Sequence, residues 1–122
     1  MPLAKNVMGA HIAAAKARAL NGNNVNAAVT AAGTTQSDAT AITADVNVIT
    51  TGTTGQGVLL YSGVPGDDQI VYNGTTADLR VYPPTGENVN QLAANSGFVL
   101  ASYTGVMVKK VSSTQWLGFL SA

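Results

Sequence analysis

The side chains that could carry out chemistry are few in this chain. It contains one histidine, His11, and no cysteine, so neither a histidine cluster nor a thiolate site can hold a metal ion. Only Asp67 and Asp68 are adjacent carboxylates, and they follow Pro65-Gly66, where Asp commonly serves turn geometry rather than a calcium site. We therefore expect no catalytic site, no metal and no cofactor. The six carboxylates are Asp38, Asp45, Asp67, Asp68, Asp78 and Glu87.

Other binding chemistries also lack a motif. The glycine-rich stretch 52–57 has no lysine and no helix after it, so it predicts a hairpin turn rather than a phosphate loop. Lys109 and Lys110 form an isolated pair on a strand, where one must face solvent. Such a pair is typical of edge-strand protection and is too little charge for a nucleic-acid surface. The aromatic residues that could stack on sugars are scattered over different strands: Tyr61, Tyr72, Tyr82, Tyr103 and Trp116.

The composition indicates a neutral protein that is buried in an assembly. Its 122 residues have no net charge, and they are 10% charged and 46% hydrophobic. Soluble domains usually carry about a quarter charged residues, so a monomer of this composition with much exposed apolar surface would be poorly soluble. Zero net charge gives no long-range attraction to nucleic acid or to a membrane, and no stretch approaches the roughly 20 apolar residues of a membrane span. The alternative is a neutral globular monomer.

The elements that would position these residues are short strands. From residue 25 onward, β-branched and aromatic residues alternate and are broken by Gly, Pro, Asn and Asp, which is typical of an all-β antiparallel sandwich or barrel. Asn73-Gly74 predicts one hairpin and Gly105 a second, while 85–96 is predicted to be a polar loop. For the Ala/Thr-rich stretch 26–57, disorder is the competing interpretation. The expected strands are Ala27–Ala31, Ala39–Ile42, Val46–Thr51, Gly57–Tyr61, Asp68–Asn73, Ala77–Tyr82, Phe98–Ser102, Val106–Val111 and Gln115–Leu120.

Residues 1–24 differ in composition and are expected to form an arm that precedes a β-domain over 25–122. Their alanines favour a short helix over about Ala10–Leu20. Two interpretations stay open: a fraying terminus, or an arm that orders on a partner. The arm holds three basic residues and no acid, while the rest holds three basic and six acidic residues, so the two parts carry +3 and −3. The basic residues of the arm are Lys5, Lys16 and Arg18.

The last expected strand, Gln115–Leu120, has apolar side chains on both faces. Trp116 and Leu120 share one face, and Leu117 and Phe119 the other. Burial on both faces indicates either a central strand of one sandwich or a terminal strand that is covered by another subunit. The second interpretation makes these four residues a candidate oligomer interface.

The order of motifs in the second half of the chain resembles that of small accessory proteins of tailed-phage virions. The match covers about half the chain, and residues 1–56 carry no matching motif. The block comprises a Gly-rich turn with an apolar strand, a P-G-D turn, a strand ending in Tyr-Asn, L-x-V-Y-P-P, G-x-x-[IV]-N, A-A-N-x-x-F and Q-W-x-x-x-L-S-A. Here these are Gly57–Leu60, Pro65-Gly66-Asp67, Val71-Tyr72-Asn73, Leu79–Pro84, Gly86–Asn90, Ala93–Phe98 and Gln115–Ala122.

This resemblance implies a structural virion protein, either a capsid decoration (cement) protein or the base of a head fibre. Such proteins are typically trimeric β-domains that bind the outer shell through an N-terminal arm. Together with the low charge and the doubly apolar last strand, the resemblance therefore implies a homotrimer. The implied partner is the major capsid protein of a tailed phage, and the implied location is the outer capsid surface, after synthesis in the host cytoplasm. The candidate capsid-binding residues of the arm are Leu3, Lys5, Val7, Ile12, Lys16, Arg18 and Leu20.

The alternative function is a tail-fibre or head-fibre module that recognises host-surface glycans. A glycan-binding module should cluster exposed aromatic residues at one loop end. A decoration protein should instead place apolar residues at a seam between subunits.

Overall fold

The chain folds as an all-β solenoid of about four turns, as described by a computed structural model for residues 24–121. The predicted all-β class is confirmed, but the predicted antiparallel sandwich or barrel is wrong. No helix among the described residues is long and apolar enough to cross a membrane. The strands are β1 (Val25–Thr30), β2 (Thr40–Ala41), β3 (Val46–Thr51), β4 (Gly57–Leu59), β5 (Asp68–Asn73), β6 (Leu79–Tyr82), β7 (Asn88–Val89), β8 (Phe98–Leu100), β9 (Gly105–Lys110) and β10 (Gln115–Leu120).

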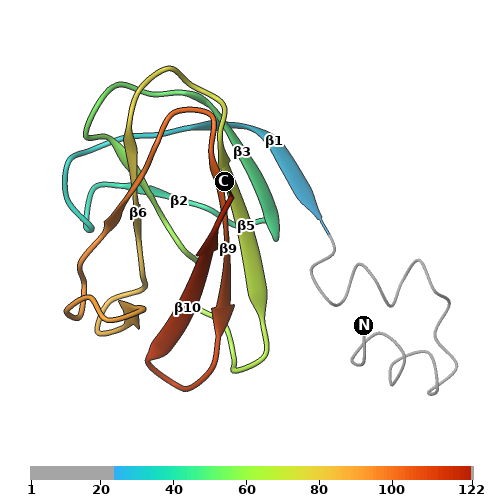
Figure 1. Cartoon of the computed structure of the whole chain (residues 1–122), viewed down its shortest axis with the longest axis vertical. Helices are drawn as coiled ribbons and strands as arrows, with labels where there is room; N and C mark the ends of the chain where they lie inside the picture. The colour runs from blue at the N-terminus through green and yellow to red at the C-terminus, as the bar shows by residue number, and fades with distance from the viewer. Residues whose placement is uncertain (1–23, 122) are drawn as a thin grey trace, which may run out of the picture.

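Strands β1 to β9 alternate between two sheets, and this alternation makes the solenoid (Figure 1). The last strand, β10, follows β9 in the same sheet. One sheet has six strands in the order β1-β3-β5-β9-β10-β7, and the other has four in the order β2-β4-β6-β8. From β1 to β4, each strand pairs in parallel with the strand two positions further along the chain. A parallel pair needs a crossover between its strands, and here the intervening strand of the opposite sheet provides it.

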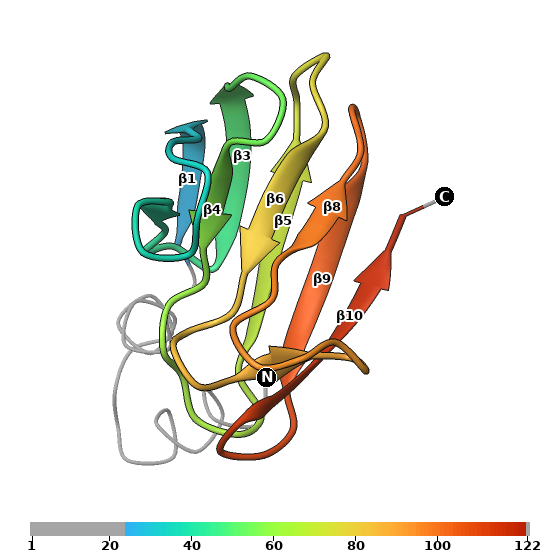
Figure 2. The same ribbon diagram turned by 90° about the vertical axis from the view of Figure 1, so that its left-hand side faces the viewer.

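The winding changes direction after β6. Strand β8 is antiparallel to β6, and β9 is antiparallel to β5 and to β10. The short strand β7 then pairs in parallel with β10 and forms the far edge of the larger sheet. Figure 2 shows the strands following one another from β1 at one side of the molecule to β10 at the other.

Both predicted hairpins are wrong, because the strands that they would join lie in different sheets. Strand β5 and strand β6 are separated by a corner at Asn73-Gly74, and β8 and β9 by a corner before Gly105. Asn73 is fully buried and donates to the carbonyls of Ala77 and Leu100 at 2.8 and 2.9 Å. Gly74 lies so close to the Ile49 carbonyl that an added Cβ would stand 2.9 Å from this oxygen. The Asn-Gly pair therefore serves a turn between sheets rather than a two-residue hairpin.

The positions of the strands were predicted better than their partners. Strands β3, β5 and β10 have the predicted bounds, and the remaining predicted strands differ by one or two residues at an end. Strand β7 was missed, since it lies inside the predicted polar loop 85–96. The stretch 52–57 joins β3 to β4 in the opposite sheet, so the predicted hairpin turn there is also wrong.

Apolar side chains from both sheets form one core between them. Since successive residues of a strand point to opposite faces, each strand contributes alternate residues. Burial of β-branched residues, Leu and one Trp in this layer is the main stabilising term of the fold. The core residues are Val29, Ala31, Ile42, Ile49, Val58, Leu60, Val71, Leu79, Val81, Val89, Leu100, Val106, Val108 and Trp116.

Buried amide side chains hold the corners of the solenoid. Gln69 is fully buried; its amide nitrogen donates to the Tyr61 carbonyl at 2.9 Å, and its amide oxygen accepts from the Tyr61 backbone N–H at 3.2 Å. Asn47 donates to the Ala44 carbonyl at 2.8 Å. These bonds satisfy backbone groups that the change of sheet removes from the ladders.

The loop at residues 33–38 is closed by Asp38. One oxygen of its carboxylate accepts from the backbone N–H groups of Thr34 and Thr35 at 3.0 and 2.8 Å, and from the Thr35 hydroxyl at 2.8 Å. These hydrogen bonds, the Thr35 backbone bond first, hold the pKa of the Asp38 carboxyl below its ordinary value.

We expect Asp38→Ala to lower the melting temperature at neutral pH and to lose this effect in acid. A carboxyl with a lowered folded pKa stabilises the fold above its unfolded pKa, and this stabilisation is lost as the pH falls through the folded pKa. The difference in melting temperature between wild type and variant should therefore narrow below the ordinary value of 3.8. Thermal melts followed by circular dichroism across this range measure it, and a difference that does not change with pH contradicts the prediction.

Candidate association surface

The outer face of the six-stranded sheet carries a continuous row of apolar side chains. Alternation along each strand places one residue set in the core and the other outside. The strand registers put Val25 opposite Val46, Val46 opposite Ile70, Ile70 opposite Met107 and Met107 opposite Phe119. We call these five residues the apolar row. Four of them are exposed by 38% to 65%, and Val46 is half-buried.

Further apolar side chains widen the row on both sides. On one side of the row, Tyr72 lies two residues after Ile70 on its strand and opposite Val48. On the other side, Leu117 lies two residues before Phe119 and opposite Lys109. Tyr72 and Leu117 are each more than a third exposed. The charges on this face form a pair at its border, where Lys109 meets Asp68 at 3.6 Å.

The outer face of the four-stranded sheet is different, because part of it is covered. Tyr82 is buried although it lies on this sheet, and its hydroxyl donates to the Thr34 carbonyl in loop 33–38. Gln36 of the same loop donates to the Pro83 carbonyl at 2.7 Å. Next to the covered area, Val99 lies opposite the exposed Arg80. The apolar row therefore has no equivalent on this second face.

The four residues of the predicted oligomer interface do not share one environment. Trp116 is fully buried within its own chain, so its burial requires no second subunit. Leu117 and Phe119 lie on the outer face, 38% and 55% exposed. Leu120 is on the inner side of β10 opposite Val106, but it is 61% exposed.

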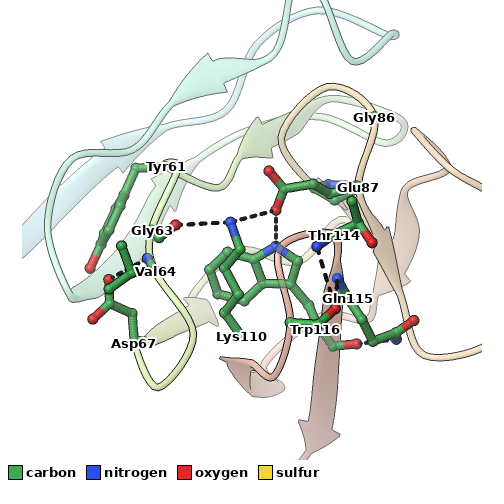
Figure 3. A network of polar contacts seen from close by, with 12 residues as sticks. Tyr61, Gly63, Val64, Asp67, Gly86, Glu87, Lys110, Thr114, Gln115 and Trp116 are labelled. Carbon is green, nitrogen blue, oxygen red and sulfur yellow. Dashed lines mark hydrogen bonds and ion pairs between the residues drawn. The ribbon is translucent and has the colours of Figure 1, made fainter.

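A buried polar network fixes β10 and β7 behind this surface (Figure 3). Lys110 and Glu87 form an ion pair at 3.1 Å, and their side chains are only 4% and 11% exposed. The indole N–H of Trp116 donates to the same carboxylate oxygen of Glu87 at 2.7 Å. Lys110 also donates to the Gly63 carbonyl at 2.9 Å and lies 5.6 Å from the centre of the Trp116 ring. Four segments of the chain are thereby joined at one point.

The interpretation of the lysine pair as edge protection is wrong. Strand β9 is not an edge strand, since β5 and β10 flank it. Lys109 faces outward, as expected for one of the two residues, but Lys110 points into the interior. The Glu87 carboxylate stabilises the charge of Lys110 there. The local sequence around Lys110 could not reveal this ion pair, because Glu87 lies 23 residues earlier, in the stretch 85–96 that was predicted to be a polar loop.

The carboxylates of the described residues serve turns and pairs. No group of three or more metal-ligating side chains comes together within 24–121. Asp67 accepts from the Val64 backbone N–H at 3.0 Å, which closes the predicted turn at Val64–Asp67. The Tyr61 hydroxyl donates a hydrogen bond to the Asp45 carboxylate. Burial of the phenol, and then this hydrogen bond and the negative charge of Asp45, raise the pKa of Tyr61. These contacts are structural, and they bring no nucleophile together with a base.

Three exposed aromatic residues lie toward one end of the larger sheet. The Tyr72 hydroxyl donates to the Tyr103 carbonyl at 3.3 Å, and Tyr103 is 60% exposed. Phe119 is also exposed and lies two residues before Ser121. The Ser121 backbone N–H donates to the carbonyl of Gly105, which lies opposite Tyr72. The other aromatic candidates are not part of this group: Tyr61 is half-buried, and Tyr82 and Trp116 are buried.

The candidate capsid-binding residues lie outside the described residues. They are Leu3, Lys5, Val7, Ile12, Lys16, Arg18 and Leu20, and the predicted helix over about Ala10–Leu20 lies there too.

The sequence predictions missed most of the apolar row. Val46, Ile70 and Met107 were treated as strand residues without a role, and Val25 was left outside the expected strands. A signal was present, because Ile70-Val71-Tyr72 and 106–108 place apolar residues on both faces of their strands, as in the last strand.

Comparisons with known proteins give no relative: no family model, no curated protein and no solved structure matches this chain. The resemblance to phage virion proteins therefore stays a prediction.

Proposed function

We propose that this protein is a structural component of a tailed-phage virion, a decoration protein that binds the outer capsid surface and stabilises the shell. The observation that supports this proposal best is the exposed apolar row, which extends over β1, β3, β5, β9 and β10. Large exposed apolar patches on soluble proteins usually mark surfaces for other proteins.

In this proposal, the two parts of the chain have separate tasks. The β-solenoid associates with other subunits and faces outward, and the basic arm attaches it to the major capsid protein. A ligand that binds only the assembled shell stabilises it by mass action. The +3 charge of the arm and the −3 charge of the rest would orient the protein on an acidic shell, while apolar contacts would supply most of the affinity.

A glycan-binding fibre module is the second candidate function. The observation that favours it is the group of Tyr72, Tyr103 and Phe119, which are 39%, 60% and 55% exposed. Aromatic faces of this kind stack on sugar rings. The row extends well beyond this group, however, to Val46 and Val25, where no aromatic residue follows. We therefore favour protein association.

We expect deletion of residues 1–20 to abolish capsid binding and to leave the β-solenoid folded. The described strands begin at Val25, and the ladders that join them pair residues within 24–121. The test mixes full-length and truncated protein with empty shells built from the major capsid protein and measures occupancy by sedimentation. Far-UV circular dichroism of the truncated protein is the control. Wild-type occupancy of the truncated protein would show that the arm is not the anchor, and absence of binding by the full-length protein would contradict the decoration function itself.

A further inference from the structure

We propose that the corner between β8 and β9 is a binding site for a neutral sugar, with the ring of Tyr103 as the surface on which the sugar stacks. The proposal rests on the second candidate function and deepens it, because it names the residues of the site and the class of its ligand. It does not depend on capsid attachment, since the corner lies at one end of the solenoid and is separate from the arm.

Tyr103 has a backbone conformation that its side chain disfavours. It is the third residue of a turn in which the Thr104 backbone N–H donates to the Ala101 carbonyl at 3.2 Å, and its φ is 56°. This position of a turn normally holds Gly or Asn, and a bulky residue there costs stability. The other non-glycine residues of 24–121 with a positive φ are both asparagines, Asn90 and Asn95.

Contacts of the Tyr103 side chain within its own chain do not offset this cost. Tyr103 is 60% exposed, so its ring buries little apolar surface. Asn90, by contrast, accepts the Gly118 backbone N–H at 2.9 Å, and Asn95 accepts that of Gly86 at 2.6 Å. Residues in disfavoured backbone conformations cluster at functional sites. A ligand that contacts the ring would account for a tyrosine at this position.

Hydrogen bonds hold the corner in place, so the ring is presented from a fixed backbone. The Ser102 hydroxyl donates to the Thr75 carbonyl at 2.7 Å, and the Tyr72 hydroxyl donates to the Tyr103 carbonyl at 3.3 Å. These bonds tie the corner after β8 to the end of β5 and the corner that follows it. Figure 2 shows both corners at the same end of the molecule. A preorganised site loses less conformational entropy when a ligand binds.

The groups beside Tyr103 suit a neutral sugar. A sugar ring has an apolar face, which can stack on an aromatic ring, and a rim of hydroxyl groups. The exposed Asp78 lies next to the turn, because its carboxylate accepts the Ser102 backbone N–H at 3.2 Å. A carboxylate only accepts hydrogen bonds, so it favours hydroxyl donors over acidic groups. Asp78 is the only charged residue in the sequence of the two corner segments, 72–78 and 101–105.

The small extent of the corner favours a sugar over a protein. A standard protein interface covers roughly 800 Å² per partner, whereas this site consists of two short corners. Its exposed aromatic residues are Tyr72 and Tyr103. A surface of this size can contact one sugar unit, and we expect a dissociation constant in the millimolar range.

The first test locates the site in the full-length protein by a two-dimensional NMR titration. The neutral probes are cellohexaose, mannohexaose and chitohexaose, and the acidic probe is hexagalacturonic acid. At least one neutral probe at millimolar concentration should shift the backbone amide signals of 102–104, and the acidic probe should shift them less. Shifts confined to another part of the chain would overturn this site and leave the second candidate function in place. No shift with any neutral probe would overturn both.

Variants of Tyr103 distinguish a binding role from a structural one. Tyr103→Phe retains the ring and should bind the probe like the wild type, whereas Tyr103→Asn should weaken binding by about tenfold or more. Because Asn tolerates a left-handed φ, Tyr103→Asn should melt at the wild-type temperature or above it. A lower melting temperature would show that the tyrosine serves the fold. That result, or unchanged binding by Tyr103→Asn, would overturn the proposal.

The capsid assay distinguishes a sugar from a protein at this corner. Tyr103→Asn should occupy shells of the major capsid protein like the wild type, since the arm is the proposed anchor. Reduced occupancy would assign the corner to a protein contact and overturn the proposal. A wild type that binds a neutral probe through Tyr103 but binds no shell would contradict the decoration function alone.

Discussion

Trp116→Ala should destabilise the folded chain by about 3–5 kcal/mol, the usual range for removal of a buried large aromatic side chain. Trp116 is fully buried in the core. Removal of the Trp116 side chain leaves a cavity between the sheets. It also removes the 2.7 Å hydrogen bond that the indole N–H donates to the Glu87 carboxylate. Urea unfolding followed by far-UV circular dichroism measures the change, since the variant has no tryptophan fluorescence.

A neighbouring residue provides the control for this prediction. Leu117→Ala removes a side chain from the same strand but from the outer face, where it is 38% exposed. Surface substitutions usually change stability by about 0.5 kcal/mol or less, so this variant should unfold close to wild type. A Trp116→Ala variant that also stays close to wild type would contradict the packing described for β10.

Glu87→Leu should be nearly as damaging, by about 3–5 kcal/mol, the range for breaking a buried ion pair by removal of one partner. Lys110 would keep the Gly63 carbonyl and the Trp116 ring but no opposite charge, while its side chain is 4% exposed. The double variant Glu87→Leu with Lys110→Met should regain much of the lost stability, because no unpaired charge is then buried. Urea unfolding of the two single variants and the double variant gives the coupling between the two residues.

The exposed ion pair of the same sheet is the matched comparison. Asp68 and Lys109 are 3.6 Å apart, but their side chains are 55% and 45% exposed. Asp68→Ala should cost less than about 1 kcal/mol, since exposed pairs are solvated and screened. If Glu87→Leu costs no more than Asp68→Ala, the buried network does not hold β7 and β10 together as described.

Much of the local structure was accessible from the sequence, because it depends on neighbouring residues. Alternation of β-branched and polar residues indicated the strands, and β5 and β10 were predicted with their observed bounds. The turn at Val64–Asp67 followed from Pro65-Gly66 and is held by the Asp67 carboxylate. In the candidate association surface, Leu117 and Phe119 were identified because the last strand is apolar on both faces.

The pairing partners of the strands could not be predicted from the sequence, because pairing depends on residues that lie far apart along the chain. Asn73-Gly74 is compatible with a hairpin and with a corner between sheets, and the local residues are the same in both cases. The corner is favoured by the burial of Asn73, whose amide donates to the Leu100 carbonyl on β8. The solenoid was therefore decided by contacts that form only when the turns stack.

The surface and its buried support depend on the same tertiary register. By composition and alternation, the sequence by itself determined an all-β chain with few charges and more apolar side chains than one face of each strand can bury. Only the fold aligned Ile70, Met107 and Phe119 into one row, because their strands must pair in one register for the row to exist. Only the fold placed Lys110 inside, because its charge is tolerable there only where the Glu87 carboxylate, one residue before β7, lies beside it.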